Sequence, residues 1–488
     1  MSKIVLIGAG SAVFSRNLIA DILSYPALSE SEIHLVDTDE RRLGIALKMA
    51  RSINLALGGR ARFETAAHYR DSLDGADFVL NMIGVGGAEA VHTDLEVPLA
   101  HGLRQTVGDT LGVGGIFRSA RSIPVLLEIA REMERRAPRA LLLNYTNPMA
   151  THVLAVARET SVRVVGLCHG IVHTAQLMRM LVEMVKIPEA EIEAHFRKPW
   201  NSPERTREWL HWLALGDDPA LSYTCAGINH MAAFLRFESG GVDLYPRLWE
   251  AMKIPHLKAL DPVRIELAHW LGYFITETSG HCAEYLPYYL KDAEATRRAN
   301  LRVAGYLESI RDLDQAVTRL EADLQEGQSV ISLPYRRSVE YASRVINAIT
   351  TNTPYVFNGN VHNRGGALIS NLPGDCCVEV PCVADAAGVT PTVIGDLPPQ
   401  IAALNSTNIH VQDLIVRGVV GQKRDYLYQA AMLDPNTSST LSLPQIKALM
   451  DEMFARHTAA GHLPETLRLR GTLRHEVLSE AYRGLGGG

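Results

Sequence analysis

The sequence predicts an α/β protein, in which a doubly wound parallel sheet is followed by a mixed α+β C-terminal domain. Short apolar runs rich in valine, isoleucine and leucine alternate with helical stretches over residues 1–195. Strands separated by helices form parallel sheets, because each connection must cross back over the sheet. The first run ends in a glycine turn of the kind that precedes a nucleotide. Beyond residue 195, extended and helical segments follow one another without this alternation.

The glycine turn after the first predicted strand contains Gly8, Gly10 and Ser11. Gly8 permits a tight turn, and Gly10 lets the backbone approach a pyrophosphate at the N-terminus of the next helix. The third glycine position of this fingerprint holds Val13, so the motif is incomplete. Asp37 ends the second predicted strand, where an acid can bind a ribose 2′-hydroxyl and favours NAD over NADP. We therefore expect a Rossmann-type NAD site, with a plain tight turn as the alternative.

Three more predicted strands continue the alternation, at residues 76–84, 140–148 and 162–167. Asn81 and Gly84 stand at the carboxyl end of the first of them. Because open parallel sheets bind ligands at that edge, we assign both residues to cofactor contact. The chain is accordingly divided into an NAD-binding domain, residues 1–195, and an α+β domain, residues 196–488, for substrate, metal and self-association.

A glycine-rich segment, residues 105–118, breaks the alternation. Glycine is costly in chain entropy, and a long glycine loop in a compact domain is usually functional or disordered. Phe117 and Arg118 are expected to start a helix at once. We therefore expect a substrate or cofactor loop that carries Asp109, rather than a disordered segment.

The second half is expected to contain several long helices and a pair of strands. The helices are predicted over residues 261–278, 294–325 and 338–350, and the strands over residues 355–360 and 377–383. Gly272 is assigned to the apolar face of the first helix. His281 and Glu284, which follow it, share a face if their segment is helical.

Cys168 and His169 follow the last strand of the first half, at the edge where α/β sheets place ligands. Cysteine and histidine together bind soft to borderline metals. Taken alone, a free cysteine is more often a core residue, and a lone histidine is more often a hydrogen-bonded one. The chain has neither a Cys-x-x-Cys pair nor a His-Glu-x-x-His motif, which argues against a closed zinc site. Cys168 and His230 are instead candidates for an open divalent metal site.

The composition argues against several other classes of protein. The 488 residues are 47% hydrophobic and 21% charged, with a net charge of −6 spread along the chain. Nucleic-acid binding needs a basic face, so it is not expected. A membrane span is not expected either, because no long uncharged apolar run is present. The chain begins directly with a strand rather than a signal peptide, so we expect a cytoplasmic protein. Its six cysteines are then thiols or ligands.

A resemblance follows from motifs that occur in order along nearly the whole chain. They are Gly8-Ala9-Gly10-Ser11, the segment Gly108 to Arg118, Asn144-Tyr145-Thr146-Asn147-Pro148-Met149, Cys168-His169-Gly170, Ile228-Asn229-His230 and Glu284-Tyr285-Leu286-Pro287. Together they resemble the motifs of the family 4 glycoside hydrolases, the NAD-dependent exception among glycosidases. The resemblance implies hydride transfer from C3 of the sugar to NAD, removal of the C2 proton, elimination at C1, addition of water and return of the hydride. A divalent cation, usually Mn²⁺, would polarise the C3 ketone.

The resemblance also implies roles for single residues. Cys168 and His230 would bind the metal, Asn147 and Asp109 would hold the sugar, and His169 would contact the substrate or assist the leaving group. The C2 base cannot be aligned from sequence. Tyr285, Glu284 and His281 are the candidates, and a structural role is the alternative for each.

The Cys-His-Gly sequence resembles the branch of the family that acts on α-linked hexuronic acids. We therefore expect an α-galacturonidase first and an α-glucuronidase next, with an α-glucosidase or α-galactosidase as further alternatives. Arg118 and Arg364 are candidate partners for a uronate carboxylate, although either arginine can have an ordinary structural role. Family members usually self-associate, so we expect a homodimer or a higher homo-oligomer.

Two alternative hypotheses about the function also require an NAD-binding domain. One is an NAD-dependent hydroxy-acid or sugar dehydrogenase, which needs no metal and accumulates NADH. The other is a redox-sensing NAD-binding regulator in which Cys168 is a thiol switch. Neither explains the glycine-rich segment or the pairing of Cys168 with His230.

Overall fold

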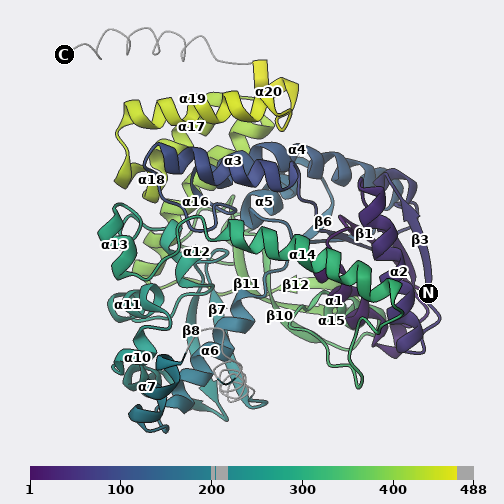
Figure 1. The fold of residues 1–488 in the computed structure, drawn as a ribbon, viewed down its shortest axis with the longest axis horizontal. Helices are drawn as coiled ribbons and strands as arrows, with labels where there is room; N and C mark the ends of the chain where they lie inside the picture. Colours follow the sequence, from purple (N-terminus) through teal and green to yellow (C-terminus); the bar gives the residue numbers. More distant parts are fainter. Residues whose placement is uncertain (199–203, 205–217, 470–488) are drawn as a thin grey trace.

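The computed structural model describes residues 1–198, 204 and 218–469. A sheet in the order β12-β11-β10-β6-β5-β4-β1-β2-β3 forms its centre (Figure 1). The parallel strands are β1 (Lys3–Ile7), β2 (Glu32–Val36), β3 (Arg62–Ala66), β4 (Phe78–Asn81), β5 (Leu141–Asn144) and β6 (Arg163–Gly166). The antiparallel extension consists of β10 (Tyr355–His362), β11 (Cys377–Asp385) and β12 (Gly388–Pro391).

The six parallel strands form a doubly wound sheet, which confirms the predicted fold class. The chain proceeds from β1 outward to β3, then returns to β4 beside β1 and proceeds outward to β6. The reversal between β1 and β4 opens a crevice at the carboxyl ends of the strands, where such sheets bind ligands. The helices that connect these strands are α1 (Ala12–Leu23), α2 (Glu40–Ala56), α3 (Gly87–Ala100), α4 (Gly112–Arg136) and α5 (Met149–Glu159). After β6 come α6 (Gly170–Met184) and α7 (Glu189–Arg197).

The second half contains a small sheet and a set of helices. The sheet is β7 (Leu221–Ala226), β8 (Ala233–Ser239) and β9 (Val242–Asp243). The helices are α9 (Tyr245–Ala251), α10 (Pro255–Lys258), α11 (Pro262–Leu271), α12 (Ser279–Glu284), α13 (Ala293–Arg298), α14 (Tyr306–Gln325), α15 (Ala342–Thr351), α16 (Pro399–Val420), α17 (Arg424–Leu433), α18 (Pro435–Thr440), α19 (Leu443–Ala459) and α20 (Glu465–Leu469). Because β10 to β12 extend the sheet of the first half, the two halves share one sheet, and the division at residue 195 stays a prediction.

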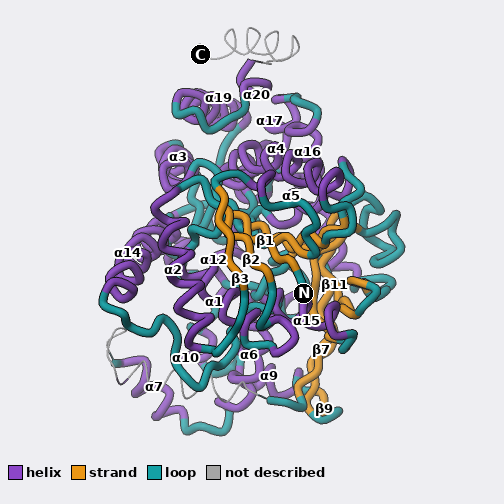
Figure 2. The backbone as a smooth tube through the Cα atoms, turned by 90° about the vertical axis from the view of Figure 1, so that its right-hand side faces the viewer, coloured by secondary structure: helices purple, strands orange, loops and turns teal. Residues whose placement is uncertain are grey.

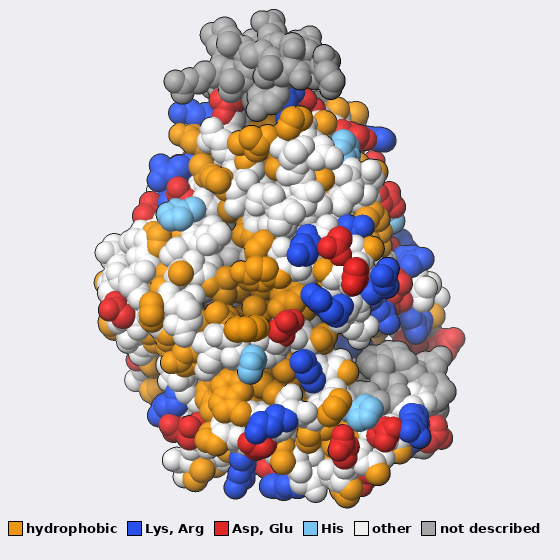
Figure 3. Space-filling view, turned by 90° about the vertical axis from the view of Figure 1, so that its left-hand side faces the viewer, with side chains coloured by type: hydrophobic (Ala, Val, Ile, Leu, Met, Phe, Trp, Pro, Cys, Tyr) orange, Lys and Arg blue, Asp and Glu red, His pale blue; other side chains and the backbone are white. Residues whose placement is uncertain are grey.

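Helices from both halves cover the large sheet (Figure 2). Helices α1, α2 and α15 pack together on one face, and α4, α5 and α16 pack together on the other. Strands β4 and β5 are buried along their whole length. Continuous apolar runs suit such strands, because both of their faces are covered. On the face shown in Figure 3, acidic and basic side chains are interspersed, and hydrophobic side chains gather near its middle. Within the described residues, no helix is long and apolar enough to cross a membrane.

Several predicted helix boundaries are wrong. Helix α4 begins at Gly112 rather than at Phe117, so much of the predicted glycine loop is helical. The helix predicted over residues 261–278 ends at Leu271, because Gly272 adopts a left-handed conformation with φ 76° and caps it. The helix predicted over residues 294–325 is interrupted between α13 and α14. These errors matter because the shortened segments supply side chains to the site described next.

Candidate active site

A cavity of about 1060 Å³ opens at the carboxyl ends of the parallel strands. Asn147 enters it after β5, and Cys168 and His169 enter it after β6. The second half contributes His230 and the segment from residue 277 to residue 281. The position agrees with the rule that open parallel sheets bind ligands outside the carboxyl ends of their strands.

Cys168 is held in place by the phenol of Tyr341. The backbone N–H of Cys168 donates to the Tyr341 hydroxyl at 2.9 Å, and this hydroxyl also lies 2.9 Å from the Cys168 carbonyl. Tyr341 is 2% exposed, so its position is fixed by packing. The thiol is therefore directed into the cavity from a rigid strand end.

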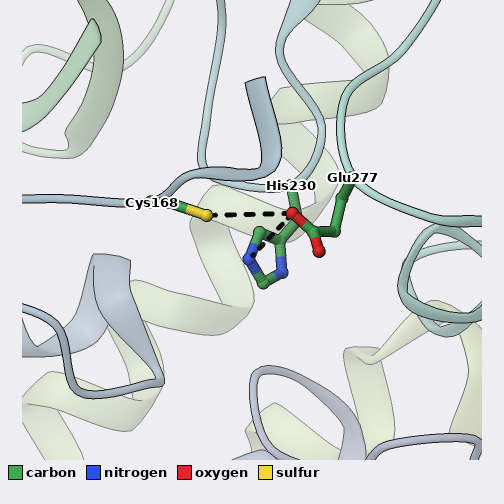
Figure 4. Close-up of side chains that lie close together, drawn as sticks. All are labelled: Cys168, His230 and Glu277. Atoms are coloured by element: carbon green, nitrogen blue, oxygen red, sulfur yellow. Dashed lines mark hydrogen bonds and ion pairs between the residues drawn. The ribbon is translucent and has the colours of Figure 1, made fainter. Parts of the chain in front are cut away.

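Cys168, His230 and Glu277 form a group that can bind a metal ion (Figure 4). One ligand atom from each residue lies within 4.8 Å of the other two. Glu277 Oε2 is 3.8 Å from both the Cys168 sulfur and His230 Nε2. Burial lowers the pKa of His230 to about 4, so its ring is neutral at pH 7, as a metal ligand must be. Burial and nearby carboxylates raise the pKa of the Cys168 thiol, an effect that a bound cation would reverse.

Two of these three residues have a strained backbone. His230 has φ 65° and Glu277 has φ 75°, which are left-handed values that favour glycine. Such conformations persist where the surrounding structure imposes them, and they cluster at functional sites. Gly170 makes room for Glu277, because a Cβ atom at position 170 would lie 1.7 Å from Glu277 Oε2.

Asp109 and His281 form an ion pair beside the metal-binding group, since the His281 ring lies 4.7 Å from the His230 ring. Asp109 Oδ1 lies 3.6 Å from His281 Nε2, and Asp109 Oδ2 accepts a hydrogen bond from Asn147 Nδ2 at 2.9 Å. Burial disfavours the charged imidazole, but Asp109 and Glu277 outweigh burial and raise the pKa of His281 to about 9. The structure thus brings together three predicted site residues, Asp109, Asn147 and His281.

His169 lines the cavity, and the carboxylate of Glu340 holds its ring in place. Its Nδ1 atom lies 2.7 Å from Glu340 Oε1, and the Glu340 side chain is 5% exposed while that of His169 is 40% exposed. The hydrogen bond to Glu340 raises the pKa of His169. A carboxylate that holds one ring nitrogen leaves the other available to a substrate atom.

Glu284 and Tyr285 lie behind the cavity wall rather than in it. Both side chains are at most 2% exposed. Glu284 Oε1 accepts hydrogen bonds from the backbone N–H groups of Thr106, Val107 and Gly108, which corrects its assignment as a proton acceptor for the sugar. Burial raises the pKa of Glu284, and these N–H groups oppose that rise. The Tyr285 ring packs 6.3 Å from the His230 ring, and its hydroxyl has no partner among the described residues.

The predicted cofactor turn has the expected geometry. Gly8 has φ 88°, and a Cβ atom there would lie 2.7 Å from the carbonyl oxygen of Met82. Asp37 Oδ2 accepts the Gly10 N–H at 2.7 Å, and Ser11 occupies the N-cap position of α1 without a capping hydrogen bond from its side chain. These contacts form a tight turn at the N-terminus of α1, where backbone N–H groups can approach a phosphate.

Asn81 is a correction to the predicted cofactor contacts. It is fully buried, and its Nδ2 atom donates to Asn144 Oδ1 at 2.7 Å. The Asn81 side chain therefore forms a hydrogen bond between β4 and β5 and does not line the cavity. Gly84 follows β4, and a Cβ atom placed there would meet nothing within 4 Å, so this part of the crevice is open to a ligand.

The two predicted carboxylate-binding arginines have different positions. Arg118 donates from Nε to the Asn147 carbonyl at 3.1 Å, so it supports the wall that carries Asn147. Arg364 is a correction. It is exposed and lines another cavity, near Met1 and Arg163 at the amino ends of the parallel strands. The structure does not bring Arg364 to the candidate site.

The residues that line the candidate site carry more acidic than basic side chains. The carboxylates are Asp109, Asp261, Glu277, Glu308 and Asp312, and the guanidiniums are Arg264 and Arg302. Arg264 donates from Nε to Asp261 at 2.8 Å, and Arg302 lies 3.4 Å from Glu308. Both arginines are therefore already paired with carboxylates, and neither is free to pair with a ligand carboxylate.

The sequence did not predict that Glu277, Glu340 and Tyr341 belong to the site. Glu277 lies in a segment that was predicted to be helical, and no local sequence signal marks its left-handed backbone. Glu340 and Tyr341 precede α15 and reach the site only through tertiary packing.

The fold and the site define the class of protein. A doubly wound sheet presents a dinucleotide-type turn, a cysteine–histidine–carboxylate group and buried ionisable side chains at one edge. Such a combination of perturbed titratable groups in a single cavity characterises an enzyme active site.

Comparison with known proteins places this enzyme in a family. Residues 3–184 match the family 4 glycosyl hydrolases, and residues 225–437 match the C-terminal domain of the same family. The chain belongs to the family 4 glycosyl hydrolases, which confirms the resemblance found in the sequence.

Curated relatives with related activities span nearly the whole chain. An α-galactosidase of Bacillus subtilis strain 168 is 38% identical and covers 94% of this chain and 98% of its own. An α-galactosidase of Rhizobium meliloti strain 1021 is 31% identical and covers 92% of this chain and 87% of its own. An α-galacturonidase of Thermoanaerobacterium saccharolyticum is 26% identical and covers 92% of this chain and 94% of its own.

Solved structures share the fold. A 6-phospho-α-glucosidase from gut microorganisms in complex with NAD and Mn²⁺ superposes with a TM-score of 0.73, at 18% identity, covering 95% of this chain and 99% of its own. A 6-phospho-β-glucosidase from Thermotoga maritima with manganese, NAD⁺ and glucose-6-phosphate gives a TM-score of 0.70, at 18% identity, covering 94% of this chain and 98% of its own.

Proposed function

We propose that this chain is an NAD- and divalent-metal-dependent α-glycosidase that hydrolyses uncharged α-D-galactosides. The observation that carries the proposal is the Cys168, His230 and Glu277 group, which lies in a cavity that Phe14 of helix α1 also lines. Relatives with NAD and manganese in their structures support both cofactors.

The residues present fit both groups. A thiolate, an imidazole and a carboxylate are three donors that leave coordination positions open for substrate oxygens, as a catalytic metal site requires. Gly8, Gly10 and Asp37 form a turn that a dinucleotide can approach. When bound, the nicotinamide supplies reversible hydride transfer, and the cation supplies Lewis-acid polarisation of a sugar oxygen.

The side chains of the chain then have separable tasks. Asp109 and Asn147, which are hydrogen-bonded to one another, present polar atoms that hold sugar hydroxyls. His169, held by Glu340, delivers a proton to the departing oxygen. His281 faces a carboxylate from each ring nitrogen, at 3.6 Å on both sides, which suits a hydrogen-bond donor better than a proton acceptor. Glu284 is occupied by backbone N–H groups and Tyr285 lies behind the cavity wall, so we propose neither as the C2 base.

The preference for a galactoside rests on the charge of the cavity and on the relatives. A uronate needs an unpaired cation or several free donors, whereas Arg264 and Arg302 are both paired with carboxylates. The two α-galactosidases are also more similar to this chain than the α-galacturonidase is. We therefore propose the uncharged sugar in place of the galacturonide expected from the Cys-His-Gly sequence.

The test compares p-nitrophenyl α-D-galactoside with p-nitrophenyl α-D-galacturonide and the corresponding glucosides, with NAD⁺ and Mn²⁺ present. We expect kcat/KM for the galactoside to exceed that for the galacturonide by about 100-fold, because a buried unpaired carboxylate is strongly disfavoured. A preference for the galacturonide would reinstate the sequence-based expectation. Steady NADH formation from a free sugar without glycoside cleavage would instead support a dehydrogenase.

A further inference from the structure

The segment that joins α3 to α4, residues 104–111, brings substrate-binding groups to the cavity, and we name it the Asp109 loop. Thr106, Val107 and Asp109 all line the cavity. Asp109 reaches Asn147 and His281 from this loop. The position of the loop backbone therefore decides where these groups meet a sugar.

A single buried carboxylate oxygen accepts hydrogen bonds from three successive backbone N–H groups of the Asp109 loop. Glu284 Oε1 accepts from Thr106 at 2.7 Å, from Val107 at 2.9 Å and from Gly108 at 2.9 Å. Gly108 has φ 64°, a left-handed value that lets its N–H turn toward the same oxygen. Consecutive N–H groups in such a curved backbone form a concave anion site. Here the anion is a side chain of the protein itself.

The same short helix presents Glu284 and His281 to different partners. Helix α12 carries His281 toward the cavity and Glu284 toward the Asp109 loop. A further contact joins the two segments, because the Thr106 hydroxyl donates to the Gly280 carbonyl at 2.8 Å. The separation between Asp109 and His281 is thus set by contacts between α12 and the loop.

We propose that Glu284 is a positioning residue that fixes Asp109 against His281 and Asn147. This inference rests on the proposed function, in which those residues hold the sugar. The other carboxylate oxygen of Glu284 has no hydrogen-bond partner in the part of the chain that the structure describes, and Oε1 accepts hydrogen bonds from the loop. Removing the Glu284 carboxylate leaves three backbone N–H groups without their acceptor. Because a buried N–H group without a partner is costly, the loop backbone is expected to shift so that these groups reach water.

Two substitutions separate positioning from proton transfer. Glu284→Gln keeps an oxygen of the same reach that can accept the loop N–H groups, whereas Glu284→Ala removes the acceptor. We expect Glu284→Ala to lower kcat by about 100-fold with a much smaller change in KM for NAD⁺, since misplacement by about 1 Å has effects of that size. We expect Glu284→Gln to retain kcat within about 10-fold of the wild type.

Asn363→Ala is the matched control. Asn363 is fully buried and also makes three hydrogen bonds to loop backbone, with the Ile369 carbonyl, the Pro373 carbonyl and the Ile369 N–H. It follows β10 and does not line the candidate cavity. We expect this variant to lose thermal stability to a degree comparable with Glu284→Ala while keeping its kcat. Equal losses of kcat in both variants would show a general structural effect and would overturn the proposal.

Hydrogen exchange gives a readout that does not depend on activity. In the NAD⁺- and Mn²⁺-loaded enzyme, Glu284→Ala is expected to accelerate amide exchange in a peptide covering residues 104–111, and Asn363→Ala is expected to leave that peptide unchanged. This result would support the loop contact even if the wild type proved inactive on galactosides. Unchanged exchange in Glu284→Ala, or a Glu284→Gln variant as inactive as Glu284→Ala, would overturn the positioning role and favour proton transfer by Glu284.

Discussion

Replacing Gly170 by alanine is expected to disrupt the metal group while leaving the fold intact. Gly170 is the first residue of α6, where alanine is a better helix former than glycine. The added Cβ atom, however, would lie 1.7 Å from Glu277 Oε2, and contacts below 3.0 Å essentially never occur. The carboxylate oxygen must therefore move by about 1.3 Å, the difference between 3.0 and 1.7 Å.

The size of the effect follows from this displacement. Metal–ligand distances tolerate changes of about 0.2 Å, so a shift of this size removes Glu277 as a ligand. Loss of a residue that merely orients a ligand weakens metal binding about 10- to 100-fold, and loss of one of three ligands should weaken it at least as much. We expect the Kd for Mn²⁺ to rise by at least about 10-fold and the Kd for NAD⁺ to change little.

Isothermal titration calorimetry with Mn²⁺ measures this change directly. Gly44→Ala in α2 is the matched control, since Gly44 is helical and a Cβ atom there meets nothing within 4 Å. The control should bind Mn²⁺ as the wild type does. An unchanged Kd for Mn²⁺ in Gly170→Ala would show that Glu277 does not bind the metal and would refute the reasoning.

Two further predictions concern the thiol and a buried histidine. Cys168→Ser should abolish metal-dependent hydrolysis with NAD⁺ affinity largely unchanged; full activity would remove Cys168 from the mechanism. Burial lowers the pKa of His152 to about 4 from 6.5, so between these pH values the unfolded chain binds more protons and the folded state loses stability as pH falls. This one group should lower the free energy of unfolding by about 3 kcal/mol as the pH falls across that interval. Urea unfolding at pH 6.5, 5.5 and 4.5 should show a shallower pH dependence for His152→Gln, and an unchanged slope would contradict the assignment.

The features that the sequence predicts well are the local ones. Continuous apolar runs and the Gly8 turn mark buried parallel strands and the cofactor turn, because strand burial and turn geometry depend on neighbouring residues. The ends of β5 and β6 likewise place Asn147 and Cys168 at one edge of the sheet. The pairing of Cys168 with His230 is predicted both from their residue types and from the family resemblance, and the structure brings these two residues together.

The features that the sequence could not predict depend on tertiary contacts. Gly114 lies in α4, and a Cβ atom there would lie 2.4 Å from the Gly108 carbonyl oxygen, so this glycine permits close packing rather than loop flexibility. The contacts of Glu284 with the Asp109 loop could not be predicted, because its partners are 176 to 178 residues away in sequence. Glu277 enters the metal group only because α11 ends early at Gly272. Self-association stays a prediction.

The most direct test of the proposed chemistry is hydrolysis of p-nitrophenyl α-D-galactoside in D₂O by enzyme stripped of NAD and metal and then reconstituted. We expect release only when NAD⁺ and Mn²⁺ are both restored, no accumulation of NADH, and deuterium at C2 of the released galactose, because the C2 proton is removed and replaced from solvent. Release without NAD⁺, or galactose without deuterium at C2, would show ordinary hydrolysis and would contradict the proposed oxidation and elimination.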